Sequence, residues 1–143
     1  MIASPTDAWR VFQQGDVPRD AFAAWQRHAK QFFDAAIELE RRDGDALRVS
    51  IGGAARVVFG RTREEADLRD ALAADAGGGL YDLAERRCRV VWLVEREGAQ
   101  DAKALVLAAA IATVALGPIL GDGRLLGVRS AREELERLAA PYR

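Results

Sequence analysis

The segment that decides the fold runs from Ala104 to Leu120 and reads ALVLAAAIATVALGPIL, without a charged residue. A helix that is apolar on every side must be buried on every side, either by protein or by lipid. At 1.5 Å per residue, the segment spans roughly 26 Å, which is at the lower limit for crossing a bilayer. Gly117-Pro118 ends the helix before the segment itself ends. We therefore expect a buried helix in the core of a folded domain, with no membrane partner.

The composition is that of one folded domain over residues 1–143. Hydrophobic residues make up 50% of the chain and charged residues 30%, and the formal net charge is −1. A chain of this length buries about two thirds of the surface that it exposes when unfolded, so it needs no metal or disulfide to build a core. Because neither sign of charge forms a long block, nucleic acid is not an expected partner.

The cysteine count and the N-terminal sequence bear on location. Cys88 is the only cysteine, so no disulfide forms within the chain, which is consistent with a reducing compartment. The first residues, MIASPTD, lack the basic and apolar regions of a secretory signal. We therefore expect a cytoplasmic protein. The preference for Ala, Arg, Asp and Gly over Lys, Asn and Ile indicates a bacterial coding sequence rich in G and C.

Two helices are predicted in the first 42 residues. Ser4 and Pro5 fit the start of a short helix within residues 1–15, and Gly15 fits its end. A longer helix is predicted from about residue 16 to 42, because apolar side chains recur at spacings of three and four. These side chains are Phe22, Trp25, Ala29, Phe32, Ala36 and Leu39. We expect this aromatic stripe to pack on the alanine face of the buried helix.

Three strands follow from local patterns. Residues 46–51 and 55–59 are β-branched runs separated by Gly52-Gly53, and paired glycines supply the positive φ angles of a tight hairpin turn. Residues 88–95 contain the unbroken apolar run VVWLV. Such a run is typical of a central strand that is covered on both faces. We therefore predict a hairpin and a central strand.

The end of the chain leaves two topologies open. Residues 124–128 are predicted to form a last strand. If this strand lies beside the central strand, the buried helix makes a right-handed parallel crossover. Asp122-Gly123 could instead turn a small antiparallel hairpin. We expect an α+β fold, a two- or three-layer α/β sandwich with one mixed sheet of about four strands, a β-hairpin and a buried helix packed on the sheet.

Few residues indicate catalysis or cofactor binding. His28 is the only histidine, and no second nitrogen ligand exists to complete a zinc site with it. Arg87 and Arg89 flank Cys88 and could activate its thiol, but its place at the start of a strand favours packing. The dinucleotide fingerprint and the phosphate-loop lysine are both missing from the sequence. We expect no catalytic residue, no metal and no cofactor, and we favour a protein that is not an enzyme.

An alternative site is predicted at the C-terminal end of the central strand. Glu95, Glu97 and Asp101 gather there, at a position where α/β proteins frequently bind ligands. With an arginine such as Arg61 or Arg124, they could form the pocket of a small-molecule-binding or small hydrolytic domain. The competing interpretation is structural, because acidic residues in the first turn of a helix complement its dipole.

The favoured functional hypothesis rests on aromatic residues near the N-terminus. If Trp9 and Phe12 lie outside the core, they form an apolar patch of the kind that marks an interface. The competing expectation is that the N-terminal helix packs on the core and hides both rings. The sequence thus favours a non-catalytic bacterial protein-interaction domain, an adaptor, regulator or inhibitor-type partner that binds another protein or a second copy of itself.

Overall fold

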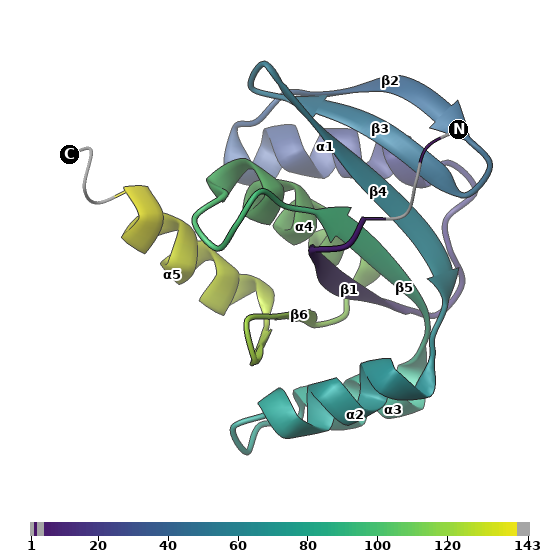
Figure 1. Cartoon of the computed structure of the whole chain (residues 1–143), viewed down its shortest axis with the longest axis vertical. Coiled ribbons are helices and arrows are strands. Elements are labelled where there is room, and N and C mark those ends of the chain that lie inside the picture. Colours follow the sequence, from purple (N-terminus) through teal and green to yellow (C-terminus); the bar gives the residue numbers. More distant parts are fainter. Residues whose placement is uncertain (1, 3–4, 140–143) are drawn as a thin grey trace.

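The computed structural model describes residue 2 and residues 5–139, which fold into a seven-stranded sheet with helices on both faces (Figure 1). The elements in chain order are β1 (Ala8–Gln14), α1 (Ala21–Phe33), β2 (Ile37–Asp43), β3 (Ala46–Ile51), β4 (Ala54–Thr62), α2 (Glu65–Ala74), α3 (Leu80–Arg87), β5 (Cys88–Glu95), α4 (Ala102–Ala115), β6 (Ile119–Gly121), β7 (Arg124–Leu126) and α5 (Val128–Ala139). The fold is α+β, as the sequence predicts.

The sheet differs from the prediction in size and direction. Its strand order is β2-β3-β4-β5-β1-β6-β7, and every neighbouring pair is antiparallel, so the expectation of a mixed sheet of about four strands was wrong in its detail. The parallel crossover does not form, because Asp122 and Gly123 adopt φ angles of 52° and 66° and turn β6 directly into β7. These are the left-handed angles of a tight hairpin turn.

The predicted helix within residues 1–15 is strand β1 in the described residues, and Ser4 lies outside them. Trp9 and Val11 face the core beneath α4, whereas Phe12 belongs to the core on the opposite face. This alternation has the two-residue period of a strand. The spacing of three between Trp9 and Phe12 fits a helix equally well, and pairing of β1 between β5 and β6 decides for the strand.

The predicted helix over residues 16–42 is shorter and is followed by a strand. Helix α1 ends at Phe33, because Asp34 adopts the left-handed conformation with φ 49°. Ile37 and Leu39 then alternate with exposed glutamates in β2, which pairs with β3. Leu39 thus belongs to a strand, although its position continues the helical stripe.

The last strand, predicted at residues 124–128, is β7 and ends at Leu126, because α5 begins at Val128. The other local predictions agree with the structure. Gly52 and Gly53 turn β3 into β4 with φ angles of 56° and 80°. Strand β5 covers the predicted residues 88–95 and lies fourth of the seven strands. Helix α4 is the buried helix, and no helix in the described part of the chain is long and apolar enough to span a bilayer.

Two apolar cores give the molecule three layers. On one face of the sheet, α4 packs against α1 and α5, and the side chains of Trp25, Ala29 and Ala108 lie in the same buried cluster. The predicted pairing of the aromatic stripe with the alanine face is present for Phe22, Trp25 and Ala29. Phe32 is 42% exposed, and Ala36 and Leu39 lie beyond the end of α1. Helices α2 and α3 cover the other face at one end of the sheet, around Phe12 and Val91 (Figure 1).

Candidate functional site

The three predicted acidic residues come together at the C-terminal end of β5, but they surround an arginine of β4. The Nε of Arg56 donates to Asp101 Oδ2 at 2.7 Å, and its Nη1 lies 3.7 Å from Glu97 Oε1. Glu95 Oε1 accepts a hydrogen bond from the backbone N–H of Val57 at 3.1 Å. The side chains of Arg56 and Asp101 are only 6% and 4% exposed. Arg56 and Asp101 therefore neutralise each other inside the protein, whereas the side chain of Glu97 is 75% exposed.

Asp101 also builds the start of α4. Its carboxylate accepts hydrogen bonds from the backbone N–H groups of Ala104 at 3.1 Å and Glu97 at 2.8 Å. Burial alone would raise the pKa of Asp101, but the hydrogen bonds from Arg56 and from both backbone groups lower it further than burial raises it. The carboxylate is thus held ionised in a structural role, as a helix cap and an ion-pair partner.

The two arginines suggested as partners of these acids lie in other clusters. Arg124 bonds Glu134 of α5 at 3.1 Å. Arg61 bonds Asp67 of α2. Neither arginine joins the three acids, and the cation that lies among them is Arg56.

Trp9 and Phe12 are buried, with exposed fractions of 2% and 0%. The Trp9 ring lies over Gly121 and under the guanidinium of Arg96, whose Cζ is 4.7 Å from the ring centroid. In the folded chain the two rings do not form the exposed apolar patch on which the interaction hypothesis rested, because β1 is an interior strand of the sheet.

His28 and Cys88 occupy positions that packing accounts for. His28 Nδ1 lies 2.9 Å from the Oγ1 of Thr113, which ties α1 to α4. Cys88 is buried, and burial raises the pKa of its thiol to about 11, so it is neutral near pH 7. Within the described residues, no group of three or more His, Cys, Asp or Glu side chains could hold a metal ion.

A pocket that the sequence did not predict lies at the other end of β5. It has a volume of about 430 Å³ and opens between the start of α1, the β2–β3 turn, the end of β4 and the first half of β5. Its lining comes from Val17, Pro18, Arg19, Asp20, Ala21, Phe22, Trp25, Arg42, Gly44, Asp45, Leu47, Gly60, Arg61, Thr62, Val90 and Trp92.

Three aromatic rings contribute to the pocket wall. Trp25 and Trp92 meet edge to face with their centroids 4.8 Å apart, and Phe22 meets Trp25 in the same way at 6.4 Å. Trp92 Nε1 donates to the buried Gln13 Oε1 at 3.2 Å, which fixes the orientation of that ring. The Nε1 of Trp25 finds no hydrogen-bond partner among the residues that the structure describes.

Gly60 makes room for one of these rings. A Cβ atom at Gly60 would lie 2.6 Å from Cζ3 of Trp92, well inside van der Waals contact. Gly60 and Trp92 are register partners across β4 and β5, so the indole ring lies over the glycine backbone. A side chain at this position would displace the ring and reshape the pocket.

The pocket rim carries charges of both signs. Arg19 and Asp20 come from the loop before α1, and Arg42 and Asp45 come from the β2–β3 hairpin. The Asp20 carboxylate is engaged, since it accepts a hydrogen bond from the backbone N–H of Ala23 at 3.1 Å. The side chains of Arg19 and Arg42 take part in no ion pair or hydrogen bond with any other described residue.

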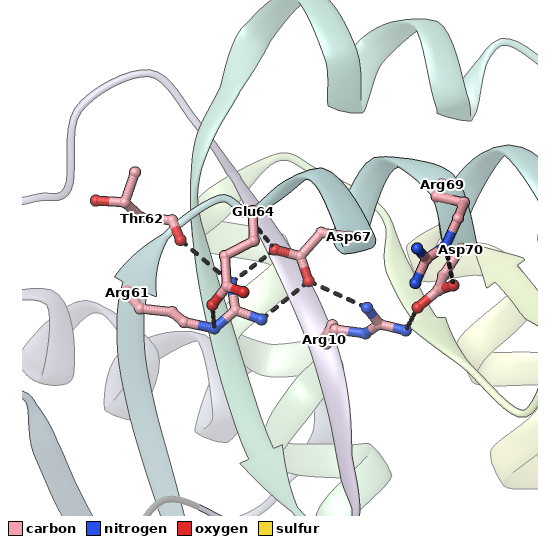
Figure 2. Close-up of polar contacts among 7 residues, drawn as sticks. All are labelled: Arg10, Arg61, Thr62, Glu64, Asp67, Arg69 and Asp70. Atoms are coloured by element: carbon pink, nitrogen blue, oxygen red, sulfur yellow. Dashed lines mark hydrogen bonds and ion pairs between the residues drawn. The ribbon is translucent and has the colours of Figure 1, made fainter.

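Arg61 also borders the pocket, but its guanidinium is committed to the other face of the sheet (Figure 2). It forms two hydrogen bonds with Asp67, of 2.6 and 2.9 Å, and Arg10 of β1 adds a third at 3.0 Å. Burial alone would raise the pKa of Asp67, yet the hydrogen bonds from Arg61, from the Glu64 backbone and from Arg10 bring it below its ordinary value. This network attaches α2 to β1 and β4 and leaves no charge of Arg61 for the pocket.

Sequence reasoning missed the pocket because its walls come from four separate segments. Only the strand order β3-β4-β5 and the position of α1 bring residues 17–25, 42–47, 60–62 and 90–92 together. One local signal was available: Gly60 interrupts a β-branched run, and an isolated glycine in a strand marks a close approach by another group. That signal identifies a neighbour but not a cavity.

The chain matches no protein-family model, no curated protein and no solved structure.

Proposed function

We propose that this chain is a non-catalytic binding domain that holds a small organic ligand in the pocket between α1 and the sheet. The observation that carries the proposal is a cavity of about 430 Å³ with three aromatic rings in its wall and, at its rim, two guanidinium groups that have no partner among the described residues. Ligand sites typically have volumes of about 300–1,000 Å³, mostly apolar walls and a few polar groups that orient the ligand. The pocket has such a volume and has charged groups at its rim, and about half of its lining is apolar.

Binding without chemistry is favoured by where the perturbed groups lie. Among the described groups whose pKa is shifted, only Arg61 borders the pocket, and its pKa is raised chiefly by its hydrogen bonds with Asp67 on the other face of the sheet. Enzymes usually concentrate such groups at the site of reaction. The charged side chains that do line the rim are suited to hold a ligand in place.

A fluorescence titration with N-phenyl-1-naphthylamine tests the proposal. This neutral aromatic probe fluoresces in apolar surroundings, and Trp25 and Trp92 in the pocket wall can transfer excitation energy to it. We expect saturable binding of one probe per chain. Ala21→Trp and Thr62→Trp place a large side chain in the cavity from two different walls, and each should weaken binding at least tenfold.

Ala102→Trp is the matched control. Ala102 is the first residue of α4 as Ala21 is the first residue of α1, but it is exposed and lies outside the pocket. It should leave probe binding unchanged. Circular dichroism and the midpoint of thermal unfolding establish that each variant is folded. The absence of saturable binding, or unchanged binding in both filling variants, would overturn the proposal.

Protein interaction is the second candidate function, and strand β2 favours it. This seven-residue strand forms one edge of the sheet, so one of its sides has no strand partner in the described chain. An extended segment of another protein, or β2 of a second copy, could pair with that edge. Glu40→Pro, at the exposed irregularity of β2 between Leu39 and Arg41, would then abolish association measured by light scattering while the pocket still binds its probe. A cytoplasmic and bacterial setting remains a prediction from the sequence.

A further inference from the structure

We infer that the ligand of this pocket is a small organic anion, with an aromatic or large apolar body against the tryptophans and its negative group at the rim. The inference rests on the proposed binding function and adds the charge of the ligand to it. It is carried by the cavity together with two arginines whose charges are unmatched within the part of the chain that the structure describes.

Arg42 is the first of these arginines. It is the register partner of Leu47 across β2 and β3, and Leu47 is a buried residue of the core that also lines the pocket. Directly opposed residues of an antiparallel pair project from the same face, so Arg42 stands over the pocket while its neighbour Arg41 projects from the other face. Arg42 therefore presents a guanidinium from the hairpin side.

Arg19 faces the same cavity from the loop that precedes α1. Most of the arginines that the structure places in contact with the core are already bound to acids: Arg10, Arg56, Arg61, Arg96 and Arg124 all have carboxylate partners. Arg19 and Arg42 have none in the described chain. A planar guanidinium offers a fork of N–H donors that suits carboxylate, sulfonate or phosphate oxygens.

The backbone at the start of α1 adds donors to the same wall. Asp20 satisfies the N–H of Ala23 with its carboxylate and the N–H of Ala24 with its carbonyl oxygen, at 3.1 and 3.3 Å. Among the described residues, the N–H groups of Ala21 and Phe22 have no hydrogen-bond acceptor, and both residues line the pocket. The first N–H groups of a helix and its dipole both favour an anion.

The acidic side chains at the rim do not cancel this preference. Asp20 is occupied as the cap of α1, and Arg61 is neutralised by Asp67 and Glu64. Among the rim groups that have no protein partner, two guanidiniums then face one carboxylate, that of Asp45. The net excess is positive, so a negative group gains more at this rim than a positive one.

A pair of probes that differ only in charge tests the inference. 8-Anilinonaphthalene-1-sulfonate is N-phenyl-1-naphthylamine with one added sulfonate, so the ratio of the two affinities isolates the contribution of the negative group. Arg42→Ala should lower the affinity for the sulfonate about tenfold and leave the affinity for the neutral probe within twofold. Arg19→Ala should act in the same direction.

Arg41→Ala is the matched control, because it removes the same charge from the adjacent residue on the opposite face of β2. It should change neither affinity. If Arg42→Ala lowers the affinity for both probes equally, Arg42 only packs against the ligand. If it leaves the affinity for the sulfonate unchanged, Arg42 does not contact the sulfonate group. Either result overturns the inference while the neutral probe still reports a working pocket. Failure of the neutral probe to bind overturns the proposed function itself.

Discussion

Charged side chains gather at both ends of β5, but within the described chain the protein pairs those at the C-terminal end and not those at the N-terminal end. At the C-terminal end, the carboxylates of Glu95, Glu97 and Asp101 are taken up by Arg56 and by backbone N–H groups. At the N-terminal end, Arg42 and Arg19 have no partner among the described residues and lie beside a cavity lined by aromatic rings. The comparison teaches that a cluster of charges marks a binding site only when the protein leaves those charges unmatched.

The direction of the strands bears on why the sequence analysis placed its alternative pocket at the C-terminal end of β5. Ligands bind at the C-terminal ends of strands in parallel sheets, where helix N-termini converge. In this antiparallel sheet, neighbouring strands run in opposite directions and the ends of β5 have no such inherent difference. The cavity lies where α1 leaves part of the sheet open, and Asp101 closes the other end as the cap of α4.

The largest expected effect on stability concerns the C-terminal end of β5, where Asp101 pairs with Arg56. Asp101→Ala removes the partner of the buried Arg56 and two acceptors for backbone N–H groups. Removing one member of a buried ion pair leaves an uncompensated charge, so we expect the free energy of unfolding to fall by about 3 kcal/mol. Urea denaturation followed by circular dichroism measures this loss.

The double variant Asp101→Ala, Arg56→Met supplies the control for this loss. It removes the stranded charge, so it should be more stable than Asp101→Ala alone. A loss below about 1 kcal/mol in the single variant would mean that the Arg56 charge reaches water, and that this end of β5 is as open as the other.

The next largest effect concerns the N-terminal end of β5, where the pocket lies. Gly60→Ala adds a Cβ at 2.6 Å from the Trp92 ring. Because that ring is held by Gln13, the strain should cost about 2 kcal/mol of unfolding free energy and weaken binding of the neutral probe. Gly127→Ala is the control, since a Cβ at Gly127 meets no atom within 4 Å. Equal stability of the two variants would contradict the close packing of Trp92.

A smaller effect concerns pH. The pKa of Asp101 is lower in the folded chain than its ordinary value of 3.8, so the ionised carboxylate stabilises the fold at neutral pH. This stabilisation is complete above the unfolded pKa and is lost as the pH falls through the folded pKa. The difference in unfolding free energy between the unaltered chain and Asp101→Asn should therefore be constant from pH 7 to about 5 and shrink below about pH 4. A difference that grows with acidity would contradict an ionised Asp101.

The sequence predicted the elements whose signals are local and missed those that depend on residues distant in the chain. The turn at Gly52-Gly53, the apolar run of β5 and the buried helix α4 each have a signal within a few consecutive residues, and all three are present. Strands β1 and β2 were predicted as helix, because residues that are three apart can face the same side in a helix while strand pairing is decided by distant partners.

The candidate site depended even more on distant information. The sequence predicted that Glu95, Glu97 and Asp101 lie together, and they do. Arg56, which forms ion pairs with Asp101 and Glu97, lies 45 residues from Asp101 along the chain. The pocket required the strand order, the end of α1 at Asp34 and the path of the 15–20 loop to be known together. The spacing of residues along the sequence gives no information on any of these three features.

The smallest expected effect compares the same residue type at the two ends. Arg42 is exposed and unpaired in the described chain, so Arg42→Ala should change the free energy of unfolding by no more than about 0.5 kcal/mol. Arg56→Ala should cost several times more, because it strands the buried carboxylate of Asp101. Thermal and urea unfolding of the two variants side by side measure the contrast. A substantial loss in Arg42→Ala would assign Arg42 a structural role, and would leave the pocket rim without the unmatched charge on which anion binding depends.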